Sequence, residues 1–523
     1  MVRNVLFIMA DQLRRDHLGC YGHPYLRTPN LDALARRGVR FEQAHVNSGV
    51  CGPSRMSYYT GRYVASHGAT WNRVPLSIGE VTMGEYLRGA GRRLALAGKT
   101  HVMPDRAGLQ RLHIDGGSEL GVLLERGGFE EIDRYDGHHA PGRESGYADF
   151  LRAQGYAGDD PWSDYVIAGL DAQGRVASGW HMRNVHLPAR VREEHSETAY
   201  MTDRAIDFIE RRGDEPWVLH LSYVKPHWPY MAPAPYHARY TADQCLPVLR
   251  TRAELRDAHP VVAAYRESEE SRSFALDECV RTVRPAYQGL VEQLDTHLGR
   301  LFERMDRIGV LGETLIVFTS DHGDFLGDHW LGEKELFYDM IQRVPLIVAD
   351  PSPAADATRG TVEHRFVDSV DVLPTVLAAL GIEGAAHRLE GASVLPLLHG
   401  SAAGVQMPVW RTAVYSELDY SFKQARRLLH KSTQDARAYS SRDARWRYVY
   451  WLDAPEQLYD LQADPDELHD LGRDRGTESV RETLRTRLFD WLARRKRRTT
   501  ITEAQVESGT AAHKRAGVFF GQW

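Results

Sequence analysis

Two pairs of side chains that can bind a metal ion each follow an apolar stretch of the chain. Residues 5–10 are apolar and lead directly into Asp11 and Gln12, and a second apolar stretch ends just before Asp321 and His322. Continuous apolar runs of this length are typical of strands buried in a parallel sheet. Because open α/β sheets bind ligands at the carboxyl ends of their strands, we expect the four side chains to converge on one cation. Any one of them, taken alone, could equally cap a helix.

Two further apolar runs also have ionisable side chains at their ends. Residues 94–97 precede Lys99 and His101, and residues 217–224 precede His227. A cation and two imidazoles at one edge of a sheet can contact an anion and exchange protons with it. A lone lysine or histidine is more often a solvated surface group, so it is the position at a strand end that makes these three residues candidates.

The order of the elements predicts the fold class. Helical patterns lie between the apolar runs, one of them over residues 29–38 with Asn30 as its N-cap and Gly38 as its C-cap. Another repeats apolar side chains on one helical face, at Leu290, Leu294, Leu298, Leu301 and Met305. This alternation of strands and helices predicts an α/β fold with a large mixed, mostly parallel sheet sandwiched by helices.

The length of the chain predicts two domains. Its 523 residues suffice for a large domain and a smaller one. We assign residues 1–400 to a catalytic α/β domain and residues 401–523 to a smaller C-terminal α+β domain with a polar tail. Within the latter, residues 446–451 predict a strand and residues 477–497 a charged helix. Residues 102–200 show no clear pattern, and we expect insertions over the edge of the sheet there.

The bulk properties argue against several classes of function. The net charge is −6 and no basic stripe is present, so nucleic acid is not an expected partner. No run reaches the roughly 18 apolar residues of a membrane span. The apolar stretch at the start is too short for a signal peptide, so we expect a cytoplasmic protein without a membrane partner. The four cysteines are scattered without CxxC spacing and predict neither a zinc site nor a disulfide framework.

One of these cysteines lies in a longer motif. The chain reads Cys51-x-Pro-x-Arg55, followed by a Thr-Gly-Arg triplet at positions 60–62. An isolated cysteine is usually a buried structural thiol, but this pattern resembles the formylglycine signature of the type I sulfatases, which belong to the alkaline phosphatase superfamily. The resemblance implies an alkaline phosphatase-like fold. It also implies that a formylglycine-generating enzyme oxidises Cys51 to an aldehyde, which is hydrated to a gem-diol.

The chemistry of such a diol follows from elementary principles. A diol oxygen beside a metal ion is a nucleophile that can attack sulfur or phosphorus and form a covalent ester. The second hydroxyl then loses its proton, the aldehyde forms again and the anion leaves by C–O cleavage. A serine at position 51 has no second hydroxyl and is predicted to stall as the ester.

The expected metal site resembles two branches of the superfamily. In sulfatases the first pair is usually Asp-Asp, whereas the pairs in this chain are similar to the Asp-Gln and Asp-His of phosphonate monoester hydrolases. The resemblance implies one divalent metal ion held by Asp11, Gln12, Cys51, Asp321 and His322. A mixture of carboxylate, amide and imidazole ligands suits Mn²⁺ better than Ca²⁺, so we favour Mn²⁺, with Ca²⁺ as the alternative.

The residues expected around the transferred anion match family elements in the same way. Lys99 and His101 match the Gly-Lys-x-His element of the sulfatases, which implies that Lys99 contacts the anion and that His101 acts as a base on the second hydroxyl. Phosphonate monoester hydrolases carry Tyr and Thr at these two places. His227 and Lys334 match the residues beside the leaving group and are expected to stabilise or protonate its oxygen. Two further contacts are expected, from Arg55 to the nucleophile oxygen and from Asn72 to the anion.

Three hypotheses about function therefore stay open. The first is hydrolysis of small-molecule sulfate monoesters, of the arylsulfatase type, through a covalent sulfo-enzyme intermediate; Lys99 and His101 favour it. The second is hydrolysis of phosphonate monoesters or phosphodiesters at the same site, which Gln12 and His322 favour. The third is a non-catalytic metal- or anion-binding protein in which Cys51 stays a thiol.

The end of the chain predicts a homo-oligomer. Residues 518–523 read Val-Phe-Phe-Gly-Gln-Trp and follow a polar stretch. Aromatic side chains at the end of a polar tail are expected to pack against a neighbouring subunit.

Overall fold

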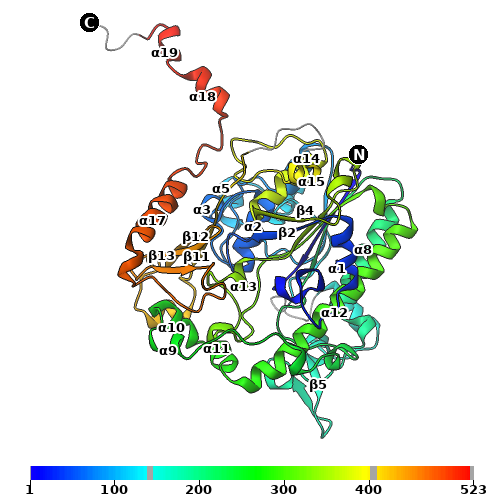
Figure 1. The fold of residues 1–523 in the computed structure, drawn as a ribbon. Helices are drawn as coiled ribbons and strands as arrows, with labels where there is room; N and C mark the ends of the chain where they lie inside the picture. Colours follow the sequence, from blue (N-terminus) through cyan, green and yellow to red (C-terminus); the bar gives the residue numbers. More distant parts are fainter. Residues whose placement is uncertain (1, 138–144, 401–408, 519–523) are drawn as a thin grey trace.

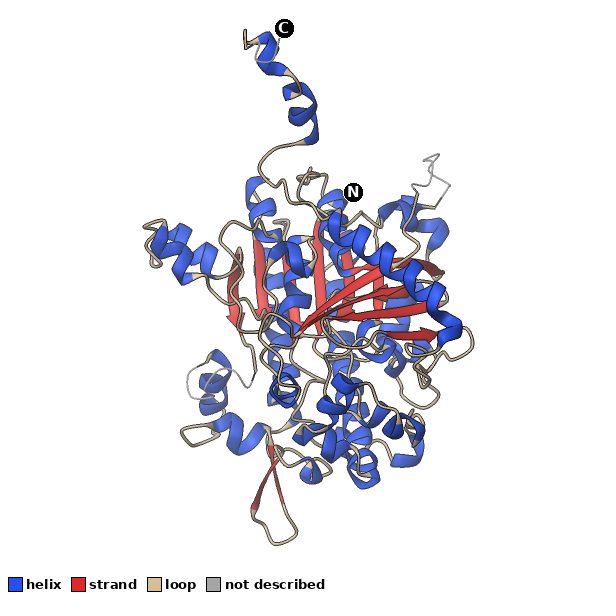
Figure 2. Ribbon diagram, turned by 90° about the vertical axis from the view of Figure 1, so that its left-hand side faces the viewer, coloured by secondary structure: helices blue, strands red, loops and turns tan. Residues whose placement is uncertain are grey.

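An eight-stranded sheet forms the centre of the molecule, with helices on both of its faces (Figures 1 and 2). The computed structural model describes residues 2–137, 145–400 and 409–518. The strand order is β10-β2-β9-β8-β1-β7-β3-β4. Every pairing is parallel except those that β9 makes with β2 and β8. The predicted mixed, mostly parallel sheet is therefore confirmed. Its strands are β1 Asn4–Ala10, β2 Val39–His45, β3 Leu94–Gly98, β4 Phe129–Arg134, β7 Val218–Tyr223, β8 Thr314–Ser320, β9 Leu346–Ala349 and β10 Val362–Asp368.

Strand β1 separates the two hydrophobic cores of the domain. All seven of its residues are buried. Because side chains alternate along a strand, Leu6 and Ile8 face one core while Phe7 and Met9 face the other. Helices α1 (Pro29–Arg37), α8 (Glu197–Arg212) and α12 (Asp277–Arg307) cover the first core, and α2 (Cys51–Thr60), α4 (Met83–Gly89) and α14 (Val372–Ala379) cover the second. The shorter helices are α3 Val64–His67, α5 Arg106–Arg111, α6 Glu119–Glu125, α7 Gly146–Ala153, α9 Ala253–Arg256, α10 Pro260–Arg266, α11 Glu269–Phe274, α13 Asp339–Gln342, α15 Leu395–His399 and α16 Gln424–Leu428.

Two local predictions need correction. The helix predicted over 29–38 begins with Pro29 and has Thr28 as its N-cap, so the prediction of Asn30 was wrong. Proline fits the first helical position because its missing N–H would have no partner there. The region 102–200 is more than insertions, since it contains the edge strand β4 as well as a hairpin of β5 (Ala168–Leu170) and β6 (Val176–Ser178).

A second, antiparallel sheet follows in the C-terminal part of the chain. It consists of β11 Val414–Asp419, β12 Arg437–Arg442, β13 Trp446–Trp451 and β14 Gln457–Asp460, against which α17 (Glu478–Ala493) packs. The predicted strand at 446–451 is confirmed. The predicted domain boundary after residue 400 adjoins residues 401–408, which lie outside the described residues.

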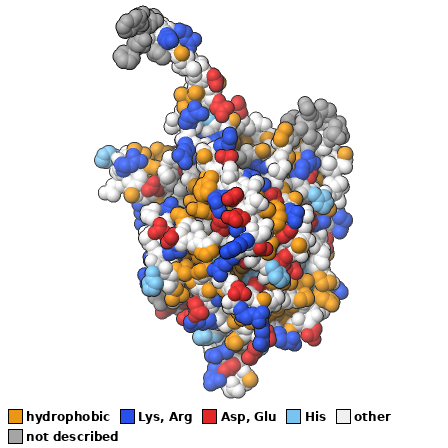
Figure 3. Space-filling model, turned by 60° about the vertical axis from the view of Figure 1, so that its left-hand side comes forward, with side chains coloured by type: hydrophobic (Ala, Val, Ile, Leu, Met, Phe, Trp, Pro, Cys, Tyr) orange, Lys and Arg blue, Asp and Glu red, His pale blue; other side chains and the backbone are white. Residues whose placement is uncertain are grey.

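The tail leaves the body of the molecule. Helices α18 (Glu503–Gly509) and α19 (Ala512–Arg515) project away from it in Figures 1 and 2. Of the aromatic end, residues 519–523 lie outside the described part. On the face shown in Figure 3, basic and acidic side chains are interspersed. Among the described helices, none is long and apolar enough to cross a membrane.

Gly98 closes strand β3 at a point where no side chain fits. Its φ is +105°, and a Cβ there would lie 1.9 Å from the carbonyl oxygen of Ser222 on β7. Gly98→Ala is therefore expected to lower the free energy of unfolding by about 2–5 kcal/mol and to displace Lys99, the next residue. Chemical denaturation measures the loss. Gly312→Ala is the control, because a Cβ at Gly312 meets no atom within 4 Å. Equal stability of the two variants would contradict a close β3–β7 contact at this point.

Candidate active site

Four buried side chains meet where β1, β8 and the start of α2 come together. The carboxylates of Asp11 and Asp321, an imidazole nitrogen of His322 and Sγ of Cys51 all lie within 4.8 Å of one another. Asp11 follows β1, Asp321 and His322 follow its parallel neighbour β8, and Cys51 is the first residue of α2. The structure thus brings Asp11, the predicted Asp321-His322 pair and the cysteine of the motif into one cluster. Gln12 is also fully buried there.

Helix α2 presents Cys51 at its amino end. Val50 before it is extended, so the helix begins abruptly, and all ten residues of α2 are buried. The amino end of a helix is positively polarised and stabilises an anion that binds there. The Gly52 N–H, which has no partner within the helix, donates to Oδ1 of Asn72 at 2.7 Å. Asn72 therefore caps the helix, and its contact with an anion stays a prediction.

Arg55 lies one helical turn after Cys51 and ties the cluster together. Its guanidinium donates to Asp321 Oδ2 at 2.8 Å, Asp11 Oδ2 at 3.1 Å and Ser222 Oγ at 2.8 Å. It also donates to the carbonyl oxygen of Lys99 at 3.0 Å. Burial opposes its charge, but the two carboxylates hold its pKa above the ordinary value. These contacts make Arg55 a bridge between the carboxylates; its predicted contact with the nucleophile is not among them.

Asp11 is ionised because cations surround it. Burial would raise the pKa of this carboxyl group, but Lys99, Arg55 and Lys334 outweigh burial and hold it well below its usual range. The Lys99 ammonium lies 2.5 Å from Asp11 Oδ2. Lys99 follows Gly98 at the end of β3, and its N–H donates to the Ser222 carbonyl at 3.1 Å. The register of β3 on β7 therefore sets where this charge lies.

His322 presents a defined nitrogen to the cluster. Its Nδ1 lies 2.8 Å from the carbonyl oxygen of Gly323, so Nδ1 carries the proton and donates. Its Nε2 points at Cys51, 3.1 Å from Sγ. Burial lowers the pKa of the imidazole, but Asp321 and Cys51 raise it to about 9 overall. A hydrogen bond from the remote nitrogen to a carbonyl is the usual arrangement of a metal-binding histidine.

Lys334 and His227, from two different segments, lie beside Gln12 and contact each other. The Lys334 ammonium donates to Gln12 Oε1 at 2.9 Å and lies 3.0 Å from His227 Nε2. His227 Nδ1 lies 2.7 Å from the Trp228 carbonyl oxygen and donates to it, which leaves Nε2 as the acceptor for Lys334. Burial lowers the pKa of Lys334, but Cys51, Glu333 and Asp11 raise it above its ordinary value. The two residues predicted beside the leaving group therefore contact each other.

His101 is held by its backbone. Its φ is +57°, and its N–H and that of Thr100 donate to Oδ1 of Asp136, at 3.2 and 2.8 Å. The residue is 8% exposed. These two hydrogen bonds to Asp136 hold the backbone of Thr100 and His101 in place just after Lys99. The sequence predicts that His101 acts as a base there.

Several residues that support the site carry no sequence signal of their own. Ser222 lies inside the apolar run of β7, where a small polar residue attracts no attention. Lys225 donates to the carbonyls of His227 and Pro229, at 3.2 and 2.8 Å, and lies 3.4 Å from Glu197 Oε2. Lys225 and Asp324 lie in the polar stretches that follow two apolar runs, but nothing in the sequence indicates these contacts.

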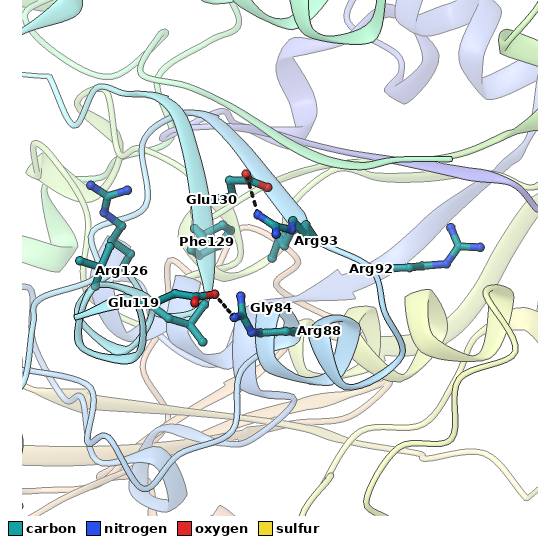
Figure 4. Close-up of a pocket in the computed structure, with 12 residues that line it drawn as sticks. Gly84, Arg88, Arg92, Arg93, Glu119, Arg126, Phe129 and Glu130 are labelled. Atoms are coloured by element: carbon teal, nitrogen blue, oxygen red, sulfur yellow. Dashed lines mark hydrogen bonds and ion pairs between the residues drawn. The ribbon is translucent and has the colours of Figure 1, made fainter. Parts of the chain in front are cut away.

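A pocket near the edge of the sheet is unrelated to this site. Figure 4 shows it between α4, α6 and the first residues of β3 and β4, with Arg88, Arg93 and Arg126 among its lining. Arg93 pairs with Glu130 at 3.2 Å, and Arg88 pairs with Glu119. The pocket lies at the amino ends of β3 and β4, whereas Lys99 follows the carboxyl end of β3. Exposed pairs of this kind contribute little energy, and the pocket holds none of the predicted site residues.

Comparison with known proteins decides the family. Residues 3–382 match the sulfatase family. The chain belongs to the sulfatase family. Residues 327–494 of this sulfatase-family chain also match the C-terminal region of N-sulphoglucosamine sulphohydrolase.

Its relatives include members of both predicted branches. It is 33% identical to the multifunctional alkaline phosphatase superfamily protein PehA of Trinickia caryophylli, over 94% of this chain and 95% of that protein. It is 28% identical to an arylsulfatase of Clostridium perfringens, over 90% of each chain. Among solved structures, the phosphonate monoester hydrolase SpPMH from Silicibacter pomeroyi superposes with a TM-score of 0.83 at 28% identity, covering 96% of this chain and 98% of that chain. The chain is therefore a hydrolase related to enzymes of sulfate and of phosphonate esters.

The family implies a metal ion, and the buried cluster fits one. Two carboxylates, the His322 imidazole and the Cys51 side chain converge within 4.8 Å, and the backbone N–H of Gln12 donates to Asp321 Oδ1 at 3.0 Å. Carboxylate oxygens and imidazole nitrogens together suit first-row divalent ions. Asp11, Gln12, Asp321, His322 and residue 51 would hold the ion.

Metal binding is expected to stabilise the folded chain. An ion that binds only the folded state adds about 2.7 kcal/mol at a hundredfold excess over its Kd, so Mn²⁺ added to the chelator-treated protein should raise the melting temperature. Asp11→Asn and Asp321→Asn should abolish the rise. Asp295→Asn should keep it, because Asp295 is buried on α12 and accepts from the Leu31 N–H at 2.8 Å. If divalent ions leave the melting temperature of the native chain unchanged, a metal site at this place is contradicted.

Proposed function

We propose that this chain hydrolyses sulfate monoesters, of the arylsulfatase type, through a covalent intermediate at position 51. Cys51, oxidised to formylglycine by a formylglycine-generating enzyme, is the nucleophile precursor. The observation that carries the proposal is the position of Cys51 Sγ, 3.1 Å from His322 Nε2 and 3.9 Å from Asp11 Oδ1, at the amino end of a buried helix. A structural thiol needs none of these neighbours.

The chain's own residues prepare position 51 for attack. A bound divalent ion and the hydrated aldehyde would supply the nucleophile and polarise the transferred group. Arg55 donates to both carboxylates and holds them side by side. The amino end of α2 and the Lys99 ammonium supply positive charge where negative charge develops. His101, on the same strand end as Lys99, is the proposed base for breakdown of the intermediate.

Lys334 and His227 serve the leaving group. Because its pKa is raised, Lys334 stays an ammonium and stabilises the charge of the departing oxygen. His227 accepts a hydrogen bond from this ammonium and holds it in place through Nε2. Its own Nδ1–H is fixed by the Trp228 carbonyl, so the imidazole cannot turn without losing both contacts.

A sulfate ester and a phosphonate ester differ in one substituent on the central sulfur or phosphorus atom, and the preference for one of them depends on that substituent. A sulfate monoester and a phosphonate monoester each carry one negative charge. The sulfuryl group has three acceptor oxygens, whereas the phosphonyl group has two oxygens and one carbon substituent. Donors at positions 99 and 101 can bind a third oxygen and offer nothing to a carbon group. We infer from this that sulfate is the preferred substrate class.

Hydrolysis of phosphonate monoesters or phosphodiesters is the second candidate. Gln12 and His322 favour it, since these metal pairs resemble those of the phosphonate monoester hydrolases. The fold similarity to one such enzyme supports it as well. We also propose Mn²⁺ as the metal, because an amide and an imidazole join the two carboxylates; Ca²⁺ is the alternative.

Relative rates on two aryl esters test the proposed function. The kcat/KM for 4-nitrophenyl sulfate should exceed that for 4-nitrophenyl phenylphosphonate. Lys99→Ala should lower kcat on the sulfate by about 10²–10³-fold, as expected for loss of one donor to the developing charge. Its effect on the phosphonate should be smaller. The reverse order of kcat/KM in the native enzyme would assign the second candidate instead, and activity on neither ester would contradict both.

We also propose that the chain forms a homo-oligomer through its tail. Helices α18 and α19 extend from the body, and Val518 is 52% exposed. Deleting residues 500–523 is expected to dissociate the oligomer while the melting temperature of the body stays unchanged, because no described side chain of α18 or α19 belongs to the buried cores. Size-exclusion chromatography measures the state. An unchanged oligomer after deletion would contradict a role for the tail.

A further inference from the structure

The amide of Gln12 lies between two partners with opposite requirements. Its Nε2 donates to Oδ2 of Asp324 at 2.5 Å, and its Oε1 accepts from the Lys334 ammonium at 2.9 Å. The two ends of an amide have the same shape, so its orientation is set by the hydrogen bonds that surround it. Here an acceptor faces the nitrogen and a donor faces the oxygen. Only one orientation satisfies both contacts.

Asp324 is built to be an acceptor. It is fully buried, and in the described structure its two carboxylate oxygens accept hydrogen bonds from three groups. Besides Gln12, the Tyr230 hydroxyl donates to Oδ2 at 2.7 Å and the Leu326 N–H donates to Oδ1 at 3.0 Å. Three donors on two oxygens fix the carboxylate in place. It does not belong to the four-residue cluster around Cys51.

The backbone of Gln12 is fixed from the other side. Its φ is +64°, and its N–H donates to Oδ1 of Asp321 at 3.0 Å. The Tyr287 hydroxyl donates to its carbonyl oxygen at 2.7 Å. With the backbone held, the remaining freedom lies in the side-chain torsions, and the contacts with Asp324 and Lys334 fix the amide at their end.

We propose that Asp324 is a positioning residue that turns the Gln12 carbonyl oxygen toward the metal site and Lys334, and that it requires an amide at position 12. A carboxylate at position 12 would place one of its oxygens against Asp324, and two carboxylates in contact repel each other. The contact with Asp324 therefore disfavours Glu, the carboxylate of the same length, at position 12. The inference rests on the proposed metal site.

Metal affinity tests the orienting role. Titration calorimetry of the full-length chain with Mn²⁺ alone, and with Ca²⁺ alone, gives the Kd. Asp324→Asn should weaken binding by about 10–100-fold, because the amide introduced at position 324 can offer a donor and let Gln12 turn its nitrogen toward the metal. Asp328→Asn is the matched control. Asp328 is equally buried but pairs with Arg14 and Arg284, both at 2.6 Å, so its loss should lower the melting temperature and leave the Kd unchanged.

A double-mutant cycle tests the requirement for an amide without any metal. Gln12→Glu keeps the shape of the side chain but faces Asp324 with a second carboxylate, so the melting temperature of the metal-free variant should fall. Adding Asp324→Asn gives the new carboxylate at position 12 a donor again. The metal-free double variant should melt at a higher temperature than Gln12→Glu alone, although Asp324→Asn by itself is destabilising.

Each outcome distinguishes this inference from the proposed function. If the native chain binds Mn²⁺ and Asp324→Asn binds it equally well, the orienting role of Asp324 is wrong while the metal site stands. If the native chain binds no metal, the proposed metal site fails, and the metal-free cycle still decides the Gln12–Asp324 pairing. Additive melting temperatures in that cycle would overturn it.

Discussion

Two carboxylates buried side by side are the constraint on which this structure depends. Asp11 and Asp321 end adjacent parallel strands and are completely inaccessible to solvent. Placing two like charges in a low-dielectric interior costs several kcal/mol for each ion unless opposite charge lies close by. Arg55 contacts both carboxylates, and Lys99 contacts Asp11. The cations beside the two carboxylates are therefore needed to keep the folded site stable.

This requirement explains the placement of helix α2. Arg55 must reach between β1 and β8, so the helix that carries it has to enter the core. All ten of its residues are buried as a result. Cys51, one turn earlier, is then brought to the cluster by the same helix. The spacing of cysteine and arginine in the motif therefore corresponds to one helical turn, with the proposed nucleophile precursor at the first residue and the arginine that bridges the carboxylates four residues later.

How far the sequence predicted this fold depended on where each strand lies. The central strands β1, β7 and β8 are buried on both faces, and their continuous apolar runs were recognised. The edge strands are only partly buried: β4 has one buried residue, Phe129, and β10 is buried only over its last three residues. Phe129–Arg134 is mostly charged, and no hydrophobic pattern marks it. The N-cap at Asn30 was wrong because the proline at position 29 begins the helix.

In the site as well, some residues could be predicted from local sequence and others could not. Residues adjacent in sequence, such as Asp11 with Gln12 and Asp321 with His322, were predicted because a strand end brings both to one place. Contacts between distant segments, such as Arg55 with Ser222 or Lys334 with His227, depend on the packing of helices and loops on the sheet and leave no local pattern. Arg55 makes four contacts to protein atoms around position 51, and its expected contact with the nucleophile oxygen stays a prediction.

The central claim is that Cys51 becomes a nucleophile of the formylglycine type, and the mass of the peptide that contains it tests this claim most directly. The chain should be produced in a host that has a formylglycine-generating enzyme, digested and analysed after treatment with iodoacetamide and, separately, with a hydrazide. We predict that this peptide has lost the mass that distinguishes a thiol from an aldehyde, that it resists alkylation and that it reacts with the hydrazide. A peptide with an intact, alkylated Cys51 would contradict the claim and would favour a protein that binds a metal or an anion without catalysis.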